Sequence, residues 1–175
     1  MDFKLLVAKR RSCRDFSHEE LDPDDVQAIL RAALMSPTSR NKRSWQFVLV
    51  DDKADLEKLA DAKEHGASFL KDAAMAVVVV CNPTDTDCWV EDGSIAAYSM
   101  LLQAEEMGLA SCWVQIRGRR LSDGTLASDV VKGILDIPDG LEVLCIVSLG
   151  RHAGRVLKPH EDSELLWENV HIGKY

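Results

Sequence analysis

Residues 76–81 read AVVVVC, and they carry the strongest signal about the fold class. Four consecutive β-branched side chains favour a strand over a helix. Because every position in the stretch is apolar, both faces of the strand should be buried. We therefore expect a central sheet with helices packed on its two faces.

The segments around this strand alternate between strand and helix patterns. Strands are expected over residues 45–50, 76–81, 110–116 and 141–149, and helices over 3–9, 52–65, 90–107 and 126–135. A further helix should begin at Pro23, with Asp22 as its N-cap, and end at Ser36 and Pro37. A short helical stretch is expected around Leu165 to Trp167 in the polar tail.

Size and charge limit the possible classes of protein. A chain of 175 residues with 46% hydrophobic content suits one domain. The net charge of -8 argues against nucleic-acid binding, which needs an excess of Lys and Arg on one face. No apolar run approaches the ~18 residues of a membrane span, and no signal-peptide pattern opens the chain. The expected location is the cytoplasm.

The five cysteines have no CxxC spacing. Cys81, Cys112 and Cys145 lie in apolar runs and are expected to be buried, reduced thiols. Cys13 and Cys88 have more polar neighbours, but neither is expected to have a nearby histidine to act as a base, so we expect no catalytic thiolate. The histidines form no ligand spacing, and we expect no metal site.

Three polar stretches interrupt the apolar patterns, at residues 10–14, 36–43 and 151–160. The first is RRSCR, and its guanidinium groups suit a phosphate because they bind oxygens bidentately. The second offers hydroxyls, cations and the Asn41 amide, which suits the edge of a heteroaromatic ring. A solvated helix end and an ordinary loop are the alternatives. From the residues alone, the sequence indicates an α/β protein with an anion site.

Four motifs in order resemble those of the nitroreductase family of FMN-dependent oxidoreductases. Residues 10–14 stand where the family has R-R/H-S-x-R/K, and SPTSRNKRSWQF at 36–47 matches [AS]-P-[ST]-[AS]-x-N-x-Q-P-W-x-F. GLASCW at 108–113 matches G-L-G-x-x-W, and an apolar strand ending at Gly150 precedes a basic tail. The resemblance covers nearly the whole chain.

This resemblance implies an α+β fold, a three-layer sandwich in which a central mixed, mostly antiparallel sheet is flanked by helices. It implies a homodimer with FMN at the subunit interface. Residues 1–175 would form a single domain, with 151–175 as a C-terminal extension that packs on the partner subunit. A Trp-bearing apolar tail in so small a chain also suggests such packing.

The resemblance also assigns site residues. Arg14 would reach the pyrimidine edge of the flavin, where positive charge stabilises the reduced ring. Backbone groups near Gln115 and Ile116 would lie beside N5. The FMN phosphate and ribityl chain would be held by Arg10, Arg11 and Ser12, completed by Arg155 or Lys158, with Arg151 as a further possible cation. The other subunit would contribute Pro37, Thr38, Ser39 and Asn41.

The implied reaction is a ping-pong oxidoreduction in which NADH or NADPH reduces FMN and a nitroaromatic, quinone or similar electron-poor acceptor reoxidises it. Since the flavin carries the chemistry, we name no catalytic side chain. Arg43 and Ser44 replace the family's Q-P, and Tyr98 replaces a frequent polar residue, which bears on the substrate. Dehalogenation, flavin cleavage and a non-enzymatic flavin-binding or cofactor-free dimer are the alternatives.

Overall fold

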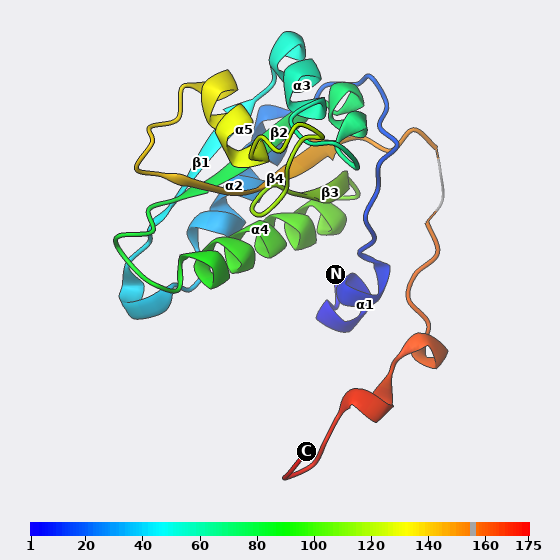
Figure 1. Cartoon of the computed structure of the whole chain (residues 1–175). Coiled ribbons are helices and arrows are strands. Elements are labelled where there is room, and N and C mark those ends of the chain that lie inside the picture. Colours follow the sequence, from blue (N-terminus) through cyan, green and yellow to red (C-terminus); the bar gives the residue numbers. More distant parts are fainter. Residues whose placement is uncertain (155–156) are drawn as a thin grey trace.

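The computed structural model describes residues 1–154 and 157–175, with a four-stranded sheet at its centre (Figure 1). The strands are β1 (Trp45–Val50), β2 (Met75–Cys81), β3 (Ala110–Gln115) and β4 (Glu142–Gly150), in the order β1-β2-β4-β3. The α+β class is confirmed. Each strand runs against its neighbour, so within the described residues the sheet is antiparallel, and the parallel pairs of a mixed sheet are not among them.

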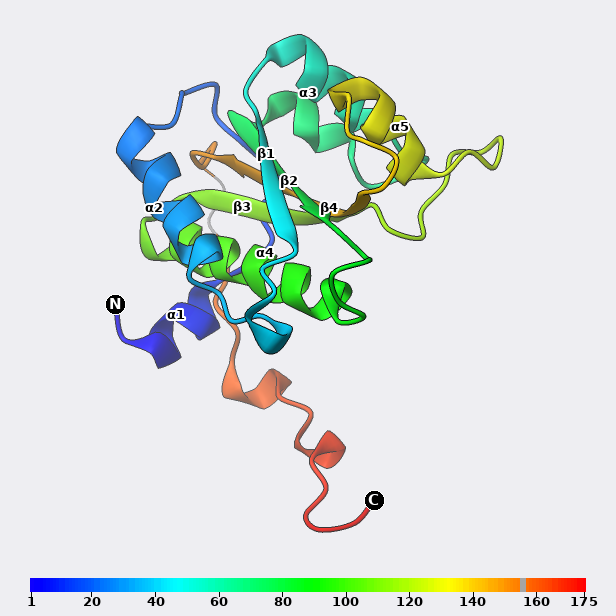
Figure 2. The ribbon, with the colours of Figure 1, turned by 90° about the vertical axis from the view of Figure 1, so that its left-hand side faces the viewer.

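Helices cover both faces of this sheet, which confirms the three-layer arrangement (Figure 2). Helices α3 (Lys53–Ala60) and α5 (Ala127–Leu135) lie on one face together with the short 3-10 helix η2 (Ser68–Asp72). Helices α2 (Pro23–Leu34) and α4 (Trp89–Glu106) lie on the other. Helix α1 (Phe3–Lys9) contacts α4, and the remaining 3-10 turns are η1 (Ser39–Asn41), η3 (Asp162–Glu164) and η4 (Trp167–Asn169).

The valine run of β2 serves both layers of helices. Val78 and Val80 pack towards α3 and α5, while Val77 and Val79 pack towards α2 and α4. Successive side chains of a strand point to opposite faces, so one strand supports two cores. All four valines are at most 1% exposed, and each contributes about 1.5–3 kcal/mol of burial free energy.

Small residues in the first half of α4 bring this helix close to the sheet. A Cβ atom at Gly93 would lie 2.6 Å from the Leu144 side chain and 2.9 Å from the Cys81 sulfur. The close approach fixes α4, and the residues at its two ends, relative to the strands.

The end of one helix and the capping of another differ from the sequence predictions. Helix α3 ends at Ala60 rather than near residue 65, and the chain turns there, with Gly66 at a φ of +76°. Asp22 does occupy the N-cap position of α2 as predicted, but its side chain makes no capping hydrogen bond. That carboxylate contacts Arg151 instead.

The C-terminal tail leaves the sheet after β4, passes α1 and extends away from the rest of the chain (Figures 1 and 2). Several of its apolar side chains are exposed: Leu165, Leu166, Trp167, Val170 and Ile172. Phe3 and Leu5 of α1 are exposed as well. Across the described residues, no helix has both the length and the apolar character that a membrane crossing requires.

Candidate functional site

The first polar stretch, residues 10–14, lies against the edge strand β3. The Cys13 N–H donates to the Ser111 carbonyl at 2.9 Å, and Phe16 pairs with His152 just beyond β4. Cys13 and Phe16 are buried, so they anchor the stretch between two ends of the sheet. The intervening backbone is therefore held in place.

The side chains of this stretch divide by burial. Arg10 and Arg11 are half-buried, whereas Ser12 and Arg14 are exposed. The Arg14 guanidinium lies 5.7 Å from the centre of the Phe69 ring. A guanidinium over an aromatic face has a preferred position even at an exposed site. Three cations and a hydroxyl thus line one edge of the sheet.

The third polar stretch returns to the first, as the sequence suggested. Leu157 packs against the cluster that contains Cys13, and the His160 N–H donates to the Ala8 carbonyl at 2.8 Å. Lys158 lies between these two attachments and is exposed. Arg155, the other predicted tail cation, lies outside the described residues.

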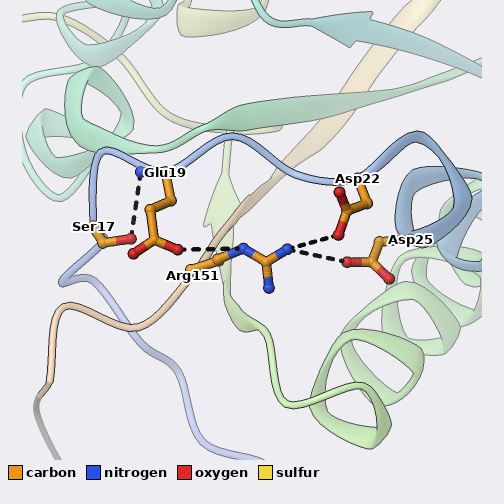
Figure 3. Close-up of polar contacts among 5 residues, drawn as sticks. All are labelled: Ser17, Glu19, Asp22, Asp25 and Arg151. Carbon is orange, nitrogen blue, oxygen red and sulfur yellow. Dashed lines mark hydrogen bonds and ion pairs between the residues drawn. The ribbon is translucent and has the colours of Figure 1, made fainter.

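Arg151 faces three carboxylates rather than the first stretch (Figure 3). Its guanidinium lies 2.9 Å from Asp22, 3.6 Å from Glu19 and 3.8 Å from Asp25. These acids compensate its charge, and they tie the end of β4 to the start of α2. Of the candidate tail cations within the described residues, Lys158 lies on the segment that Leu157 and His160 attach near the first stretch.

The expectation that Cys13 has no histidine near it is wrong. The Cys13 sulfur lies 3.6 Å from Nδ1 of His152, a residue 139 positions away. The pairing of Phe16 with His152 brings the two together. Sequence spacing gave no sign of it, because the contact depends on how the tail crosses the sheet edge. The sulfur also lies 3.4 Å from the Asp15 carbonyl oxygen.

The end of β3 carries the predicted Gln115 and Ile116. The Gln115 side chain accepts from the Trp113 indole N–H at 2.9 Å and donates to the Arg117 carbonyl at 2.8 Å. Ile116 is buried, with its N–H directed at the Leu144 carbonyl at 3.4 Å. This end of the strand is therefore rigid.

Lys63 joins this region, and sequence reasoning missed it. Its ammonium donates to the Gln115 carbonyl at 3.1 Å across 52 positions. Burial lowers the pKa of Lys63, and the charges of Arg119 and Arg14 lower it further. Burial raises the pKa of the Cys112 thiol, and Arg14 opposes that rise. Lys63 is therefore within electrostatic reach of both Arg14 and Arg119.

The second polar stretch, residues 36–43, forms a strained turn. Arg40, Asn41 and Arg43 all have φ between 51° and 55°, a region that non-glycine residues seldom occupy. The Arg43 N–H donates to the Thr38 hydroxyl at 3.1 Å, and its side chain donates to the Asn41 amide oxygen at 2.9 Å. Such strain is retained where the surroundings enforce it, often at functional sites.

Asp92 holds this turn, and it too was missed. It is 3% exposed at the start of α4, and one of its oxygens accepts from the Ser39 N–H at 2.8 Å. Burial raises the pKa of the nearby Cys81 thiol to about 12, with Asp92 adding to the rise. Three buried polar atoms here have no hydrogen-bond partner among the described residues: Asp92 Oδ2, Ser44 Oγ and Trp45 Nε1.

Within one chain, the first and second stretches lie at opposite ends of α4. Ser39 is bonded to Asp92 in its first turn, whereas Glu105 in its last turn lies beside Arg10 and Arg11. Thirteen residues of helix separate the two acids by about 20 Å. The structure therefore unites the first and third stretches and leaves the second apart.

Glu105 is an acidic neighbour of the first stretch. Burial raises the pKa of its carboxyl, and the charges of His152 and Arg10 oppose that rise. The Arg11 backbone N–H opposes the rise of this pKa as well. Within the described part of the chain, no group of three or more Cys, His, Asp or Glu side chains is arranged to hold a metal ion.

Comparisons with known proteins identify relatives over most of the chain. The model of the nitroreductase family matches residues 7–68 and 63–151. A protein of Archaeoglobus fulgidus, named as a candidate NADH dehydrogenase/NAD(P)H nitroreductase, is 32% identical over 83% of this chain and 82% of its own length. An oxygen-insensitive NADPH nitroreductase of Helicobacter pylori is 37% identical over 45% of this chain and 38% of its own.

A solved structure agrees over nearly the full length. The FMN-dependent nitroreductase of Clostridium difficile R20291 superposes with a TM-score of 0.94 and 37% identity. The alignment covers 97% of this chain and 98% of that one. The fold and the order of the motifs are thus shared with a relative of similar size.

Proposed function

Because the chain belongs to the nitroreductase family, we propose that it is an FMN-dependent oxidoreductase that takes reducing equivalents from NADH or NADPH. The observation that carries this proposal is the meeting of the first stretch with the tail. The packing of Leu157 near Cys13 and the bond from His160 to Ala8 join two basic segments more than a hundred residues apart, in a chain of net charge -8. A phosphate bound there would offset the repulsion among the cations of these segments.

The residues present fit an FMN phosphate. Arg10 and Arg11 supply planar donors suited to phosphate oxygens, Ser12 supplies a hydroxyl, and Lys158 supplies a point charge. Arg155 remains part of the proposed set. Arg151 is excluded because Glu19, Asp22 and Asp25 engage its guanidinium.

The flavin ring would lie along β3. Arg14, held over Phe69, would meet its pyrimidine edge, and the backbone near Gln115 and Ile116 would lie beside N5. When bound, FMN supplies the capacity to accept a hydride from the nicotinamide and pass electrons to an acceptor. The chain's own groups orient the ring and surround it with positive charge, and no side chain needs to move a proton.

The second stretch would serve the site of the other subunit. Thr38, Ser39 and Asn41, with Pro37 before them, lie at the far end of α4 from Arg10, so they suit a second flavin across a two-fold axis. The exposed apolar side chains of α1 and of the tail offer a surface for such a partner. We propose a homodimer in which residues 151–175 of each single-domain chain pack on the other.

The proposed acceptors are nitroaromatics, quinones and similar electron-poor compounds, reduced in a ping-pong cycle after the oxidised nicotinamide leaves. The proposed location is the cytoplasm. All five cysteines are free, which fits a reducing compartment.

Stopped-flow spectroscopy tests the function. The FMN-loaded protein is mixed with NADH or NADPH, and the reduced protein is then mixed with a nitroaromatic, a quinone and a halogenated phenol. We expect rapid reduction by at least one nicotinamide and reoxidation by the first two acceptors. If neither nicotinamide reduces the flavin, the reductase proposal fails. If only the halogenated phenol reoxidises the reduced flavin, dehalogenation becomes the favoured function.

A further inference from the structure

A cavity of about 460 Å³ lies beyond the end of β3, outside the set of residues proposed to hold FMN apart from Gln115. Its walls come from the turn after α3 and from the loop that follows β3. The lining residues are Lys63, Glu64, His65, Gln115, Gly118, Arg119 and Arg120. Two chain segments that are distant in sequence thus enclose one basic space.

The charges of this cavity are poorly compensated. Lys63, Arg119 and Arg120 are its basic residues, and Glu64 is the one acid among the described residues that line it. Glu64 lies 3.7 Å from His65. None of the ion pairs found among the described residues involves Lys63, Arg119 or Arg120. The lowered pKa of Lys63, which arises first from burial and then from Arg119, reflects the same crowding of positive charge.

The basic side chains are also directed by local contacts. The Lys63 ammonium is fixed on the Gln115 carbonyl at 3.1 Å, and the Arg120 guanidinium donates to the Gly124 carbonyl at 2.6 Å. Arg117, in the same loop, lies instead with its guanidinium 5.4 Å from the centre of the Trp89 ring. Arg117 does not line the cavity. Neighbouring arginines of one loop therefore face different surroundings.

We propose that this cavity binds the phosphate groups of the nicotinamide dinucleotide while its nicotinamide lies beside the flavin. The proposal rests on the proposed function, which places Gln115 next to N5 of the ring. A nicotinamide stacked there must direct the rest of its dinucleotide to a neighbouring space, and the cavity shares Gln115 with that position. Guanidinium forks and a lysine are the donors that phosphate oxygens prefer.

Two phosphate sources share this chemistry. The pyrophosphate is common to NADH and NADPH, whereas the 2′-phosphate belongs to NADPH alone. If Arg119 and Arg120 bind the pyrophosphate, they serve both donors equally. If they bind the 2′-phosphate, they select NADPH.

Calorimetric titration with ADP-ribose tests the site without turnover, because this compound carries the pyrophosphate and no nicotinamide. The protein is used FMN-loaded, and the titration is paired with one using the 2′-phosphorylated form. We expect Arg119→Gln and Arg120→Gln each to weaken binding about tenfold (~1.4 kcal/mol). Loss with both compounds assigns the pyrophosphate, and loss with the 2′-phosphorylated form alone assigns the 2′-phosphate.

Arg117→Gln is the matched control, since it removes the same charge from the same loop without touching the cavity wall. The dissociation constants of Arg117→Gln for ADP-ribose and for its 2′-phosphorylated form should stay within twofold of the parent values. Equal binding by all variants, or an equal loss in Arg117→Gln, would overturn the proposal. So would loss of FMN from Arg119→Gln, because the cavity would then belong to the flavin. Failure of nicotinamides to reduce the flavin is a separate result that addresses the proposed function.

Discussion

Two arginine-rich segments border β3, and they are held in different ways. Residues 10–14 are fastened between β3 and the tail, with Arg10 and Arg11 half-buried. Residues 117–120 form a loop beyond the strand in which every residue is exposed. The two segments are therefore similar in composition, but residues 10–14 are more buried and more firmly anchored than residues 117–120.

That difference suits two kinds of ligand. A resident cofactor is best held by groups that are already ordered, because ordering them on binding costs affinity. A donor that leaves in every cycle is served by exposed charges whose attraction is weaker and screened by salt. We therefore associate residues 10–14 with FMN and residues 117–120 with the transient dinucleotide.

The largest expected effect is on FMN retention. Arg10→Ala or Arg14→Ala removes charge-assisted hydrogen bonds worth about 1.5–3 kcal/mol each, so the FMN dissociation constant should rise about 10- to 100-fold. Arg119→Ala and Arg120→Ala are the matched controls and should change it less than threefold. Flavin fluorescence titration of the apoprotein measures all four. Equal effects from the four variants would remove the distinction between the segments.

A smaller effect is expected at Asp92, which anchors the second stretch. Asp92→Ala leaves the Ser39 N–H without its buried acceptor, and such a loss costs about 1–3 kcal/mol. Urea unfolding should show this loss. Asp92→Asn keeps a carbonyl oxygen at the site and should recover most of the stability.

Glu91→Ala is the control for Asp92, because Glu91 is an exposed acid in the same helical turn. FMN affinity should fall in Asp92→Ala and remain unchanged in Glu91→Ala, since the turn is proposed to contact the flavin of the other subunit. An Asp92→Ala protein with full stability and full FMN affinity would contradict the anchoring role.

A third comparison distinguishes the roles of two tail cations, Lys158 and Arg151. Lys158→Met should weaken FMN binding several-fold, because a cation of the phosphate site is lost. Arg151→Met should leave FMN binding unchanged and lower the unfolding free energy by about 1 kcal/mol, since three carboxylates lose their shared partner. The loss should shrink in 1 M salt. Weakened FMN binding by Arg151→Met would assign this residue to the phosphate site instead.

The sequence predicted the framework of the molecule well. The strand over 45–50 has the predicted bounds, and the valine run is buried on both faces. Local patterns suffice for such elements, because the apolar period reports which faces are covered. The early end of α3 at Ala60 was not predicted, because the spacing of apolar residues does not reveal the turn that contains Gly66.

Local sequence patterns could not predict the contacts that complete the site. Lys63 meets Gln115 across 52 positions, Ser39 meets Asp92 across 53, and Cys13 meets His152 across 139. Each pair forms only after the sheet brings its ends together. Motifs identified the three polar stretches, but the structure was needed to show that Arg151 is engaged by Glu19, Asp22 and Asp25.

The smallest expected effect concerns Glu105, an acid beside residues 10–14. Burial holds its pKa above that of the unfolded chain, so between the two values the folded state binds more protons. The free energy of unfolding should therefore decrease as the pH rises from about 4.5, the usual glutamate value, through the folded-state pKa. Glu105→Gln keeps a side chain of the same shape with a carbonyl oxygen and removes the titration.

The parent and Glu105→Gln proteins should thus be about equally stable below that window, and the variant should be the more stable above it. Urea unfolding between pH 4 and pH 8 compares them, with Glu91→Gln on the same helix as the control. The variant should also bind FMN slightly more tightly, because a negative charge near the proposed phosphate position is gone. If the unfolding free energies of the parent and Glu105→Gln changed in parallel with pH, the partly buried Glu105 carboxylate would cost no stability. Residues 10–14 would then differ from residues 117–120 only in how their backbone is anchored.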